Sequence, residues 1–562
     1  MTKLLKRWTV AAPITEVANK ELDAYSELFR QVLFNRGIAS REEADAFLNT
    51  TKVDTTNSDL LGIPEAVQRI RTAIEKNEKI VIYGDYDADG VTATALLVIL
   101  LQALNATVKE FLPDRVDDGY GLRNSKLDEL LANGTKLVIT VDCGIRAVEQ
   151  AKHARKIGLD LIITDHHTPG SQIPDVVAVI NPKQPADDYE DKDLAGVGVA
   201  YKLACGLLDT YPNAPIKAEE LLDLVAIGTV ADLAPLMGEN RALVSQGIEN
   251  IQMSTRQGLF SLLGITGVQP SEVNTGKIGF TIGPRINAAG RIGSAVDSFN
   301  LIVSTDPSIT GELAQKLENI NRERQKKTID IHEKARKLLG EDVEKDYIIF
   351  AAHPEFNPGV VGLAASRLAE NYYRPAIVAS QTDTHTRGSC RSIPEFHITA
   401  ALEQCSDLLD HFGGHAAAAG FTISNENLDE FISRLKKISK EQLSGIDLRP
   451  VVHADANTKL SDLTPSLIKE LSKLEPTGYG NSEPIFISRG VQLLSKRTVG
   501  RNNNHLKLTL SDGKVVFDAI AFNFGELLDE LGGFVDIAYK YELNIFNGRR
   551  NLQLNLVDII PA

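Results

Sequence analysis

The sequence has little of what exported proteins and zinc-binding proteins need. Among its 562 residues there are only four cysteines (Cys143, Cys205, Cys390 and Cys405), and none forms a CxxC pair. This spacing argues against a zinc–thiolate centre and a disulfide framework, so the thiols are predicted to be reduced. No apolar run has the length of a membrane span, and the start, residues 1–13, lacks the apolar core of a signal peptide. We therefore expect a cytoplasmic protein that has no contact with a membrane.

Positive charge and aromatic residues are also scarce. The formal net charge is -15 and aromatic residues make up 6% of the chain. A nucleic-acid partner would therefore need a local basic groove, and base stacking would contribute little to binding. Hydrophobic residues make up 43%, which is ordinary for a globular protein. At about 150 residues per domain, the length predicts three or four domains.

Short apolar runs alternate with amphipathic stretches between residues 76 and 235, which is typical of a parallel sheet covered by helices. Strands are predicted at 79–83, 136–141, 159–164 and 176–180, with helices at 91–104 and 145–157. Apolar residues recur at helical spacing within 309–339, which predicts a long connector helix. A second α/β region is predicted at 341–446, with strands at 347–352, 376–380 and 387–392 and helices at 359–371 and 398–411.

Strict alternation of apolar and polar residues begins after residue 447. Segments 505–510, 515–520 and 552–556 are predicted to be antiparallel strands. Asn547-Gly548 predicts a tight hairpin between 541–546 and 549–557, because both positions accept a positive φ. The last region is therefore expected to form a small β-barrel.

Three carboxylates stand at alternate positions directly after the first predicted strand, at Asp85, Asp87 and Asp89, followed by Gly90. In an extended backbone these side chains point to one face, where they would repel one another. A folded protein tolerates such crowding mainly around a cation. Taken alone, an acidic turn between a strand and a helix explains the segment equally well.

Further acidic and imidazole groups follow the next predicted strands. Asp142 follows 136–141, Asp165-His166-His167 follows 159–164, and Asp232 ends the apolar segment 227–231. The carboxyl ends of parallel strands share one edge of a sheet, so these groups are expected to converge. Several carboxylates with imidazole suit Mn²⁺ or Mg²⁺. An isolated aspartate at a strand end is often only a helix cap, but the whole ordered set favours a metal site.

This ordered set resembles the DHH phosphoesterase superfamily, and within it the RecJ-type exonucleases. The resemblance extends over nearly the whole chain and includes Gly283-Pro-Arg285-Ile-Asn287-Ala-Ala-Gly-Arg291, the segment from Asn357 to Arg367, Arg391-Ser392, and Gly413-Gly414-His415-Ala-Ala-Ala-Ala-Gly420. It implies an N-terminal helical segment at 1–75, a parallel-sheet DHH domain at 76–305, a connector helix at 306–340, an α/β DHH-associated domain at 341–446 and an OB-fold β-barrel at 447–562.

The resemblance also implies an activity and a role for each residue. The expected enzyme is a metal-dependent exonuclease that degrades single-stranded DNA from 5′ to 3′ into mononucleotides, in recombination and repair. Two Mn²⁺ or Mg²⁺ ions would be bridged by Asp142 and held by His166 and Asp232, while Asp165 supports the site. Which of Asp85, Asp87 and Asp89 bind metal stays open. Substrate contacts are expected from His167, Arg285, Asn287, Arg291, Arg391, Ser392, Gly413, Gly414 and His415.

The Gly413-Gly414-His415 turn is expected to precede a helix start that offers free N–H groups to a phosphate. The barrel is expected to track the strand with Lys496, Arg497, Arg501, Arg549 and Arg550. The implied partners are single-stranded DNA, a single-strand-binding protein and a helicase, and the protein is expected to be a monomer. Two alternatives stay open: a phosphodiesterase for oligonucleotides or cyclic dinucleotides, and a scaffold that binds single strands without cleaving them.

Overall fold

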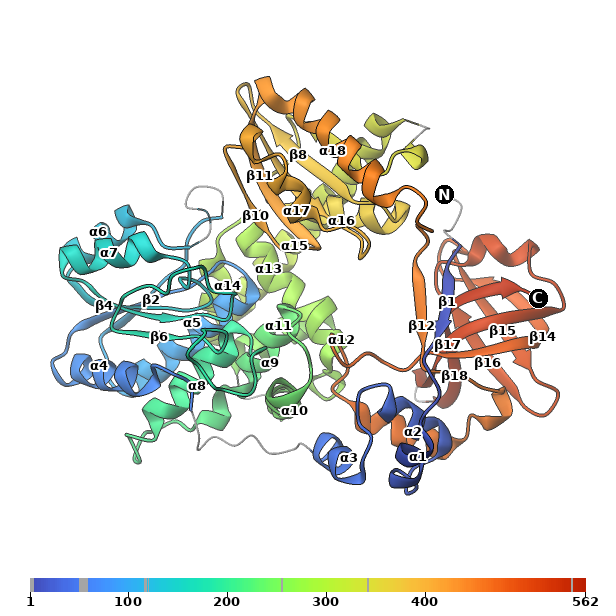
Figure 1. The fold of residues 1–562 in the computed structure, drawn as a ribbon. Coiled ribbons are helices and arrows are strands. Elements are labelled where there is room, and N and C mark those ends of the chain that lie inside the picture. The colour runs from blue at the N-terminus through green and yellow to red at the C-terminus, as the bar shows by residue number, and fades with distance from the viewer. Residues whose placement is uncertain are drawn as a thin grey trace. The chain divides into compact units, whose positions relative to one another are not determined.

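The computed structural model describes residues 5–49, 59–115, 119, 121–253, 256–340, 343–546 and 549–562 (Figure 1). The chain divides into two compact units. Residues 51–448 form one unit, and residues 1–50 join residues 449–562 in the other. Within the described residues, no helix combines the length and the apolar character that crossing a bilayer requires.

A five-stranded parallel sheet in the order β3-β2-β4-β5-β6 forms the centre of the first α/β domain. Its strands are β2 (Lys79–Tyr83), β3 (Val108–Phe111), β4 (Thr135–Thr140), β5 (Asp160–Thr164) and β6 (Ala178–Ile180). The predictions for β2, β4, β5 and β6 are confirmed to within two residues. β3 was not predicted, because a four-residue edge strand with the sequence Val-Lys-Glu-Phe has no apolar run.

Helices pack around this sheet. They are α4 (Ile63–Glu75), α5 (Ala88–Ala103), α6 (Asn124–Ala132), α7 (Val148–Ile157), α8 (Gly196–Leu208), α9 (Leu222–Ala231), α10 (Gly238–Met253), α11 (Gln257–Thr266), α12 (Thr275–Lys277), α13 (Gly283–Ile292) and α14 (Ala295–Val303). α5 is buried on almost all sides. It begins three residues before the predicted start, because Asp87 Oδ1 accepts hydrogen bonds from the N–H groups of Asp89 and Gly90.

The predicted connector helix is confirmed as α15 (Pro307–Leu339), which has 33 residues and a length of about 50 Å. It belongs to two hydrophobic cores. Ala314 and Leu317 pack into the core of the first α/β domain, whereas Ile331 and Ala335 pack into that of the second. α15 is therefore a shared structural element, which an apolar stripe with a charged outer face allows.

The second α/β domain contains a mixed sheet in the order β10-β11-β9-β8-β7. Its elements are β7 (Ile349–His353), β8 (Ala376–Gln381), β9 (His385–Arg391), β10 (His411–Gly414), β11 (Ala418–Ser424), α16 (Val361–Tyr372), α17 (Ile398–Glu403) and α18 (Leu428–Leu443). The helix predicted at 398–411 is wrong beyond Glu403. Likewise, no helix starts after Gly413-Gly414-His415, because β10 and β11 form an antiparallel hairpin there. Alternating burial along β11 against β9 favours the strand.

In the other unit, β14 (Phe486–Val499), β15 (His505–Ser511), β16 (Val516–Ala521), β18 (Arg549–Pro561) and β17 (Phe534–Phe546) pair in that order. β14 also pairs with β17, so the predicted barrel is confirmed and closed. The short β13 (Ala456–Asn457) pairs in parallel with β14, and α19 (Pro465–Leu471) packs against the barrel. β17 and β18 are antiparallel as predicted, but the Asn547-Gly548 turn lies outside the described residues.

The first 75 residues are not one segment in the structure. β1 (Arg7–Val10) pairs in parallel with β12 (Val451–Ala454). Three helices, α1 (Glu16–Glu21), α2 (Glu27–Phe34) and α3 (Arg41–Leu48), contribute to the core of the barrel unit through residues such as Phe29. α4 instead packs into the first α/β domain. The boundary predicted at residue 75 therefore differs from the observed division, which follows apolar contacts between distant segments of the chain.

Candidate active site

Buried acidic and imidazole side chains gather at the carboxyl edge of the first sheet. Asp85 follows β2, Asp142 follows β4 and Asp165-His166-His167 follows β5. Asp232 instead follows a helix, α9. The sequence pattern predicts only an apolar segment there. Asp85, Asp89, Asp142 and Asp165 are each at most 4% exposed. The predicted convergence is confirmed.

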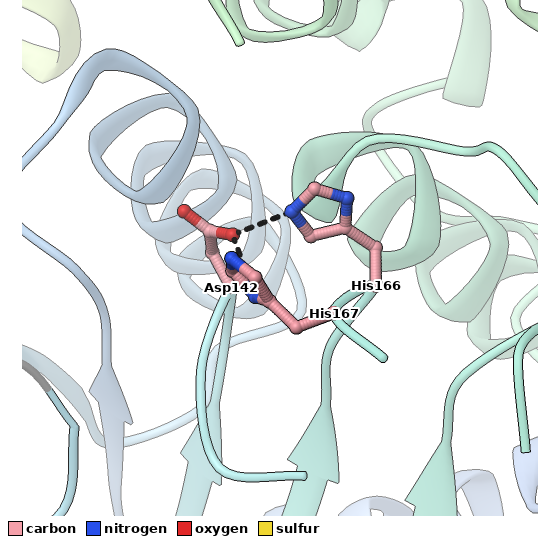
Figure 2. Close-up of side chains that lie close together, drawn as sticks. All are labelled: Asp142, His166 and His167. Carbon is pink, nitrogen blue, oxygen red and sulfur yellow. Dashed lines mark ion pairs between the residues drawn. The ribbon is translucent and has the colours of Figure 1, made fainter. Parts of the chain in front are cut away.

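The side chains form three linked groups, and the ligand atoms within each group lie within 4.8 Å of one another. The groups are Asp85, Asp87 and Asp142; Asp142, His166 and His167; and Asp89, His166 and Asp232. Asp142 Oδ1 lies 3.1 Å from His166 Nε2 and 3.9 Å from His167 Nδ1 (Figure 2). Asp142 and His166 each belong to two groups, so these two side chains link the three groups into one cluster.

The atoms in this cluster fit a divalent cation. Within the described part of the chain, Asp85 Oδ1 and His166 Nε2 are buried and have no hydrogen-bond partner. The His166 ring already bonds to the backbone of Leu194, so the lone pair of Nε2 faces the Asp142 carboxylate. Two acceptors 3.1 Å apart repel each other unless a cation or a proton lies between them. Carboxylate and imidazole ligands together suit Mn²⁺ or Mg²⁺.

Without a cation, burial makes the charged forms of these groups costly. Burial and then the Asp87 charge raise the pKa of Asp89 to about 7. Burial and then Asp89 raise the pKa of Asp232 to about 9. The pKa of Asp142 is raised for the same reasons. Burial also lowers the pKa of His166 to about 3, so its imidazole is neutral and able to bind metal.

The three acids of the first motif differ in what they already bind. Each Asp89 oxygen accepts one backbone hydrogen bond at the start of α8, Oδ2 from Gly196 N at 2.7 Å and Oδ1 from Val197 N at 2.8 Å. Asp87 uses Oδ1 to cap α5. Asp85 keeps Oδ1 without a hydrogen bond. The geometry therefore distinguishes three positions that the sequence pattern treats alike.

Asp165 supports the site and is already saturated with hydrogen bonds. Its Oδ1 accepts from the backbone of His166 and His167 and contacts His167 Nδ1 at 2.7 Å, while Oδ2 accepts from Ile145 N. Burial opposes the charge of both partners. Their mutual hydrogen bond nevertheless lowers the pKa of Asp165 and raises that of His167. Asp165 thus orients His167, whose side chain is 34% exposed.

Backbone features that the sequence analysis did not identify keep the cluster compact. Asp142 has a φ of 60°, a left-handed conformation that aspartate tolerates better than most residues. A Cβ atom on Gly196 would lie 2.8 Å from Asp142 Cβ and 2.9 Å from Asp89 Oδ2. A Cβ on Gly290 would lie 2.0 Å from the carbonyl oxygen of Tyr86. The Gly-Val-Gly sequence at the start of α8 was the available signal for the first contact.

Arginine side chains gather next to the acidic cluster. Arg115 donates from Nε to the Gly290 carbonyl and lies over the Tyr86 ring at 4.0 Å. Burial and then the charges of Arg115, Arg324 and Arg391 lower the pKa of Arg291 to about 10. Burial and the Arg115 charge also lower the pKa of Arg391. The structure brings together the predicted Arg291 and Arg391, and it adds Arg115, which the sequence analysis missed.

Three other predicted substrate contacts have internal partners. Arg285 forms an ion pair with Glu318 on α15 at 2.7 Å. Asn287 Oδ1 accepts from Ala88 N at 2.8 Å, and Ser392 Oγ donates to the Phe396 carbonyl. Gly413 and Gly414 end β10, and His415 follows them, exposed at the hairpin tip. Partial burial lowers the pKa of His415, and the charge of His167 contributes to the shift.

The basic residues of the barrel mostly face solvent. Arg497, Arg501 and Arg550 are exposed, while Lys496 donates from Nζ to the carbonyls of Leu528 and Leu531. The side chain of Arg549 lies outside the described residues. Their role in holding a strand stays a prediction.

Comparisons with known proteins agree with this architecture. Family models match as the DHH family N-terminal domain at residues 79–229, the DHHA1 domain at 344–441 and the RecJ OB domain at 454–558. The fold and the metal-binding cluster define a phosphoesterase of the DHH class.

Relatives that match nearly the full chain show which family within this class the protein belongs to. The single-stranded-DNA-specific exonuclease RecJ of Bacillus subtilis is 39% identical, covering 98% of this chain and 70% of its own. The RecJ exonuclease of Salmonella typhimurium is 35% identical, and the match covers 95% of this chain and 96% of that protein. The crystal structure of Thermus thermophilus RecJ with Mn²⁺ has a TM-score of 0.86 at 31% identity, covering 99% of this chain and 80% of that one. The chain belongs to the RecJ family of single-stranded-DNA-specific exonucleases.

Proposed function

We propose that this protein is a metal-dependent exonuclease that hydrolyses single-stranded DNA from the 5′ end into mononucleotides, in recombination and repair. The observation that carries the proposal is the set of three linked ligand groups around Asp142. Family membership identifies the substrate, because the named relatives are single-stranded-DNA-specific exonucleases.

The proposed ligands follow from the geometry. Asp85, Asp87 and Asp142 would hold one divalent cation, and Asp142, His166, Asp89 and Asp232 a second. Asp89 would bind while keeping its two backbone hydrogen bonds, since a carboxylate has lone pairs for more than one partner. Two such ions, when bound, supply the Lewis acidity that activates water and offsets charge on a phosphodiester.

The remaining side chains would position the DNA. His167, oriented by Asp165 and half-buried at the edge of the cluster, is placed to contact the scissile phosphate together with His415. Arg115, Arg291 and Arg391 offer a cluster of guanidinium groups beside Asp85 and Asp87. A terminal 5′-phosphate carries more negative charge than an internal one, so this cluster favours a 5′ end as the point of entry.

Labelled oligonucleotides test the proposal. Single-stranded DNA labelled at its 5′ or 3′ end, duplex DNA and a dinucleotide are incubated with Mn²⁺, and the series is repeated with Asp142→Ala. We expect mononucleotides to be released from the 5′ end of the single strand, and no release by the variant. Cleavage of the dinucleotide alone would favour the phosphodiesterase. Tight binding without any Mn²⁺-dependent release would favour the scaffold.

Several finer expectations remain proposals. The remaining functional boundaries would lie at residues 305, 340 and 446, and Arg285, Asn287, Ser392, Gly413 and Gly414 would contact DNA from their present positions. A helicase would supply the single strands, and a single-strand-binding protein would deliver them. The protein would act as a monomer in the cytoplasm, and its four buried cysteines without a disulfide favour that reducing compartment.

A further inference from the structure

Two basic side chains outside the arginine cluster, Arg146 and Lys183, flank the loop that carries His167, and neither has a role in the proposed function. β4, β5 and β6 are consecutive neighbours in the parallel sheet, so the loops that follow them lie next to one another. Arg146 is in the loop after β4, His167 in the loop after β5, and Lys183 in the loop after β6. The topology alone therefore places a basic residue on each side of His167.

Hydrogen bonds fix the three loops together. Arg146 Nε donates to the carbonyl of Thr168 at 2.9 Å. The fully buried Asn181 donates from Nδ2 to the His167 carbonyl at 2.9 Å, and its Oδ1 accepts from Lys183 N at 2.8 Å. One side chain thus links the His167 backbone to that of Lys183, which sets the position of the lysine relative to the cluster.

The two cations have little to neutralise them. Among the described residues, no carboxylate lies within 4.0 Å of the Arg146 guanidinium, and Lys183 Nζ reaches only Asp193, at 3.9 Å. The Lys183 side chain is 31% exposed. Burial lowers the pKa of His415, and the charges of His167, Arg146 and Lys183 lower it further, so all four groups lie within electrostatic range. Such a group attracts an anion.

We propose that Lys183 is a catalytic residue that contacts the scissile phosphate on the His167 side of the metal cluster, and that Arg146 attracts the strand toward it. This inference rests on the proposed function. Lys183 would stabilise the negative charge that develops on the phosphate during cleavage, whereas the exposed Arg146 would act mainly on binding. No bond to the protein forms, because the ammonium group only donates hydrogen bonds.

The test is single-turnover cleavage of 5′-labelled single-stranded DNA with Mn²⁺. We expect Lys183→Met to lower the rate constant at saturating DNA by about 100-fold and Lys183→Arg to recover part of the loss. Arg146→Met should weaken binding several-fold at low salt and leave the rate constant nearly unchanged. Two matched controls should keep the rate constant within about twofold of the wild type. Asp193→Asn removes the ion-pair partner of Lys183, and Lys192→Met removes a nearby lysine that donates to the Asp187 carbonyl.

Two further measurements separate a direct role from a structural one. Mn²⁺ affinity, followed by electron paramagnetic resonance, should not fall in Lys183→Met. In metal-free DNA binding, each of Lys183→Met and Arg146→Met should reduce the slope of log Kd against log salt by about 0.7.

Three results would overturn the inference: a Lys183→Met rate within threefold of wild type, joint loss of rate and Mn²⁺ affinity, or an equal loss in Asp193→Asn. Absence of cleavage by the wild-type protein would instead contradict the proposed function, and the salt slopes would still report on the phosphate contacts.

Discussion

Two clusters of like charge lie next to each other in the same unit, and their side chains behave oppositely. At the sheet edge, burial and then the neighbouring carboxylates raise the pKa of Asp142 and of Asp232. Beside them, burial and then neighbouring guanidinium groups lower the pKa of Arg291 and of Arg391. Asp87 belongs to one of the ligand groups and also lies close enough to Arg291 for their charges to interact, so the two clusters adjoin at Asp87.

The comparison indicates what each cluster is for. A protein that needed only stability would pair these charges, because a buried charge without a partner costs several kcal/mol. Like charges held together are suited to a ligand of the opposite sign. The carboxylates suit cations and the guanidinium groups suit phosphate, so a metal-bound DNA end would satisfy both clusters at once.

Removing the shared carboxylate should have the largest effect. Asp142→Asn keeps the side-chain volume and tolerates the left-handed backbone, so it tests the charge without adding strain. We expect the Mn²⁺-dependent cleavage rate to fall by about 1000-fold, equivalent to about 4 kcal/mol. The melting temperature without metal should rise, because a buried like charge is lost. A variant that keeps a tenth of the activity would show that Asp142 does not bridge.

Disrupting the cationic cluster should have a smaller effect and leave the metal in place. Arg291→Met removes one phosphate-binding group, and we expect kcat/KM for 5′-phosphorylated DNA to fall by about 100-fold. Mn²⁺ affinity should not decrease. The control Arg155→Met removes an exposed arginine paired with Asp175. Equal losses on 5′-hydroxyl and 5′-phosphate DNA would contradict a terminal-phosphate role for Arg291.

Crowding the acidic cluster from outside should weaken metal binding without removing a ligand. In Gly196→Ala the new Cβ atom would contact Asp142 and Asp89 at less than 3.0 Å. We expect Mn²⁺ affinity, measured by calorimetry, to fall roughly 30-fold. Gly264→Ala is the matched control, because its Cβ would meet nothing within 4 Å. Similar affinities in the two variants would mean that the cluster adjusts freely.

The smallest expected effect is a change of Mn²⁺ affinity with pH. Asp89 and Asp232 have folded-state pKa values of about 7 and about 9, above their values in the unfolded chain. Their contribution to stability is therefore full at low pH and is lost as pH rises through these values. Metal needs the deprotonated forms, so affinity should increase about 15-fold from pH 7 to pH 8, mainly through the deprotonation of Asp232. Melting temperatures with and without Mn²⁺ measure this, and a gap that narrows with rising pH would contradict it.

The regularity of parallel strands made much of the fold and site predictable. Strands β2, β4 and β5 read as apolar runs because both faces are covered, and an acid at the end of each run marks the shared edge. The edge strand β3 and the hairpin of β10 and β11 lack such runs. Arg115 was missed for a related reason, since its partners Gly290 and Arg291 are far away in the sequence.

What the sequence determined by itself was local: the apolar runs, the acids that end them, the connector helix and the alternation of the barrel. Tertiary structure decided which partners residues of the same type have. Asp85 keeps a buried oxygen without a hydrogen bond while Asp89 binds the start of α8, and Arg285 pairs with Glu318 while Arg291 joins other arginines. The reason is physical, because periodicity along a chain is set by neighbouring residues, whereas burial and charge pairing depend on segments that meet only when the chain folds.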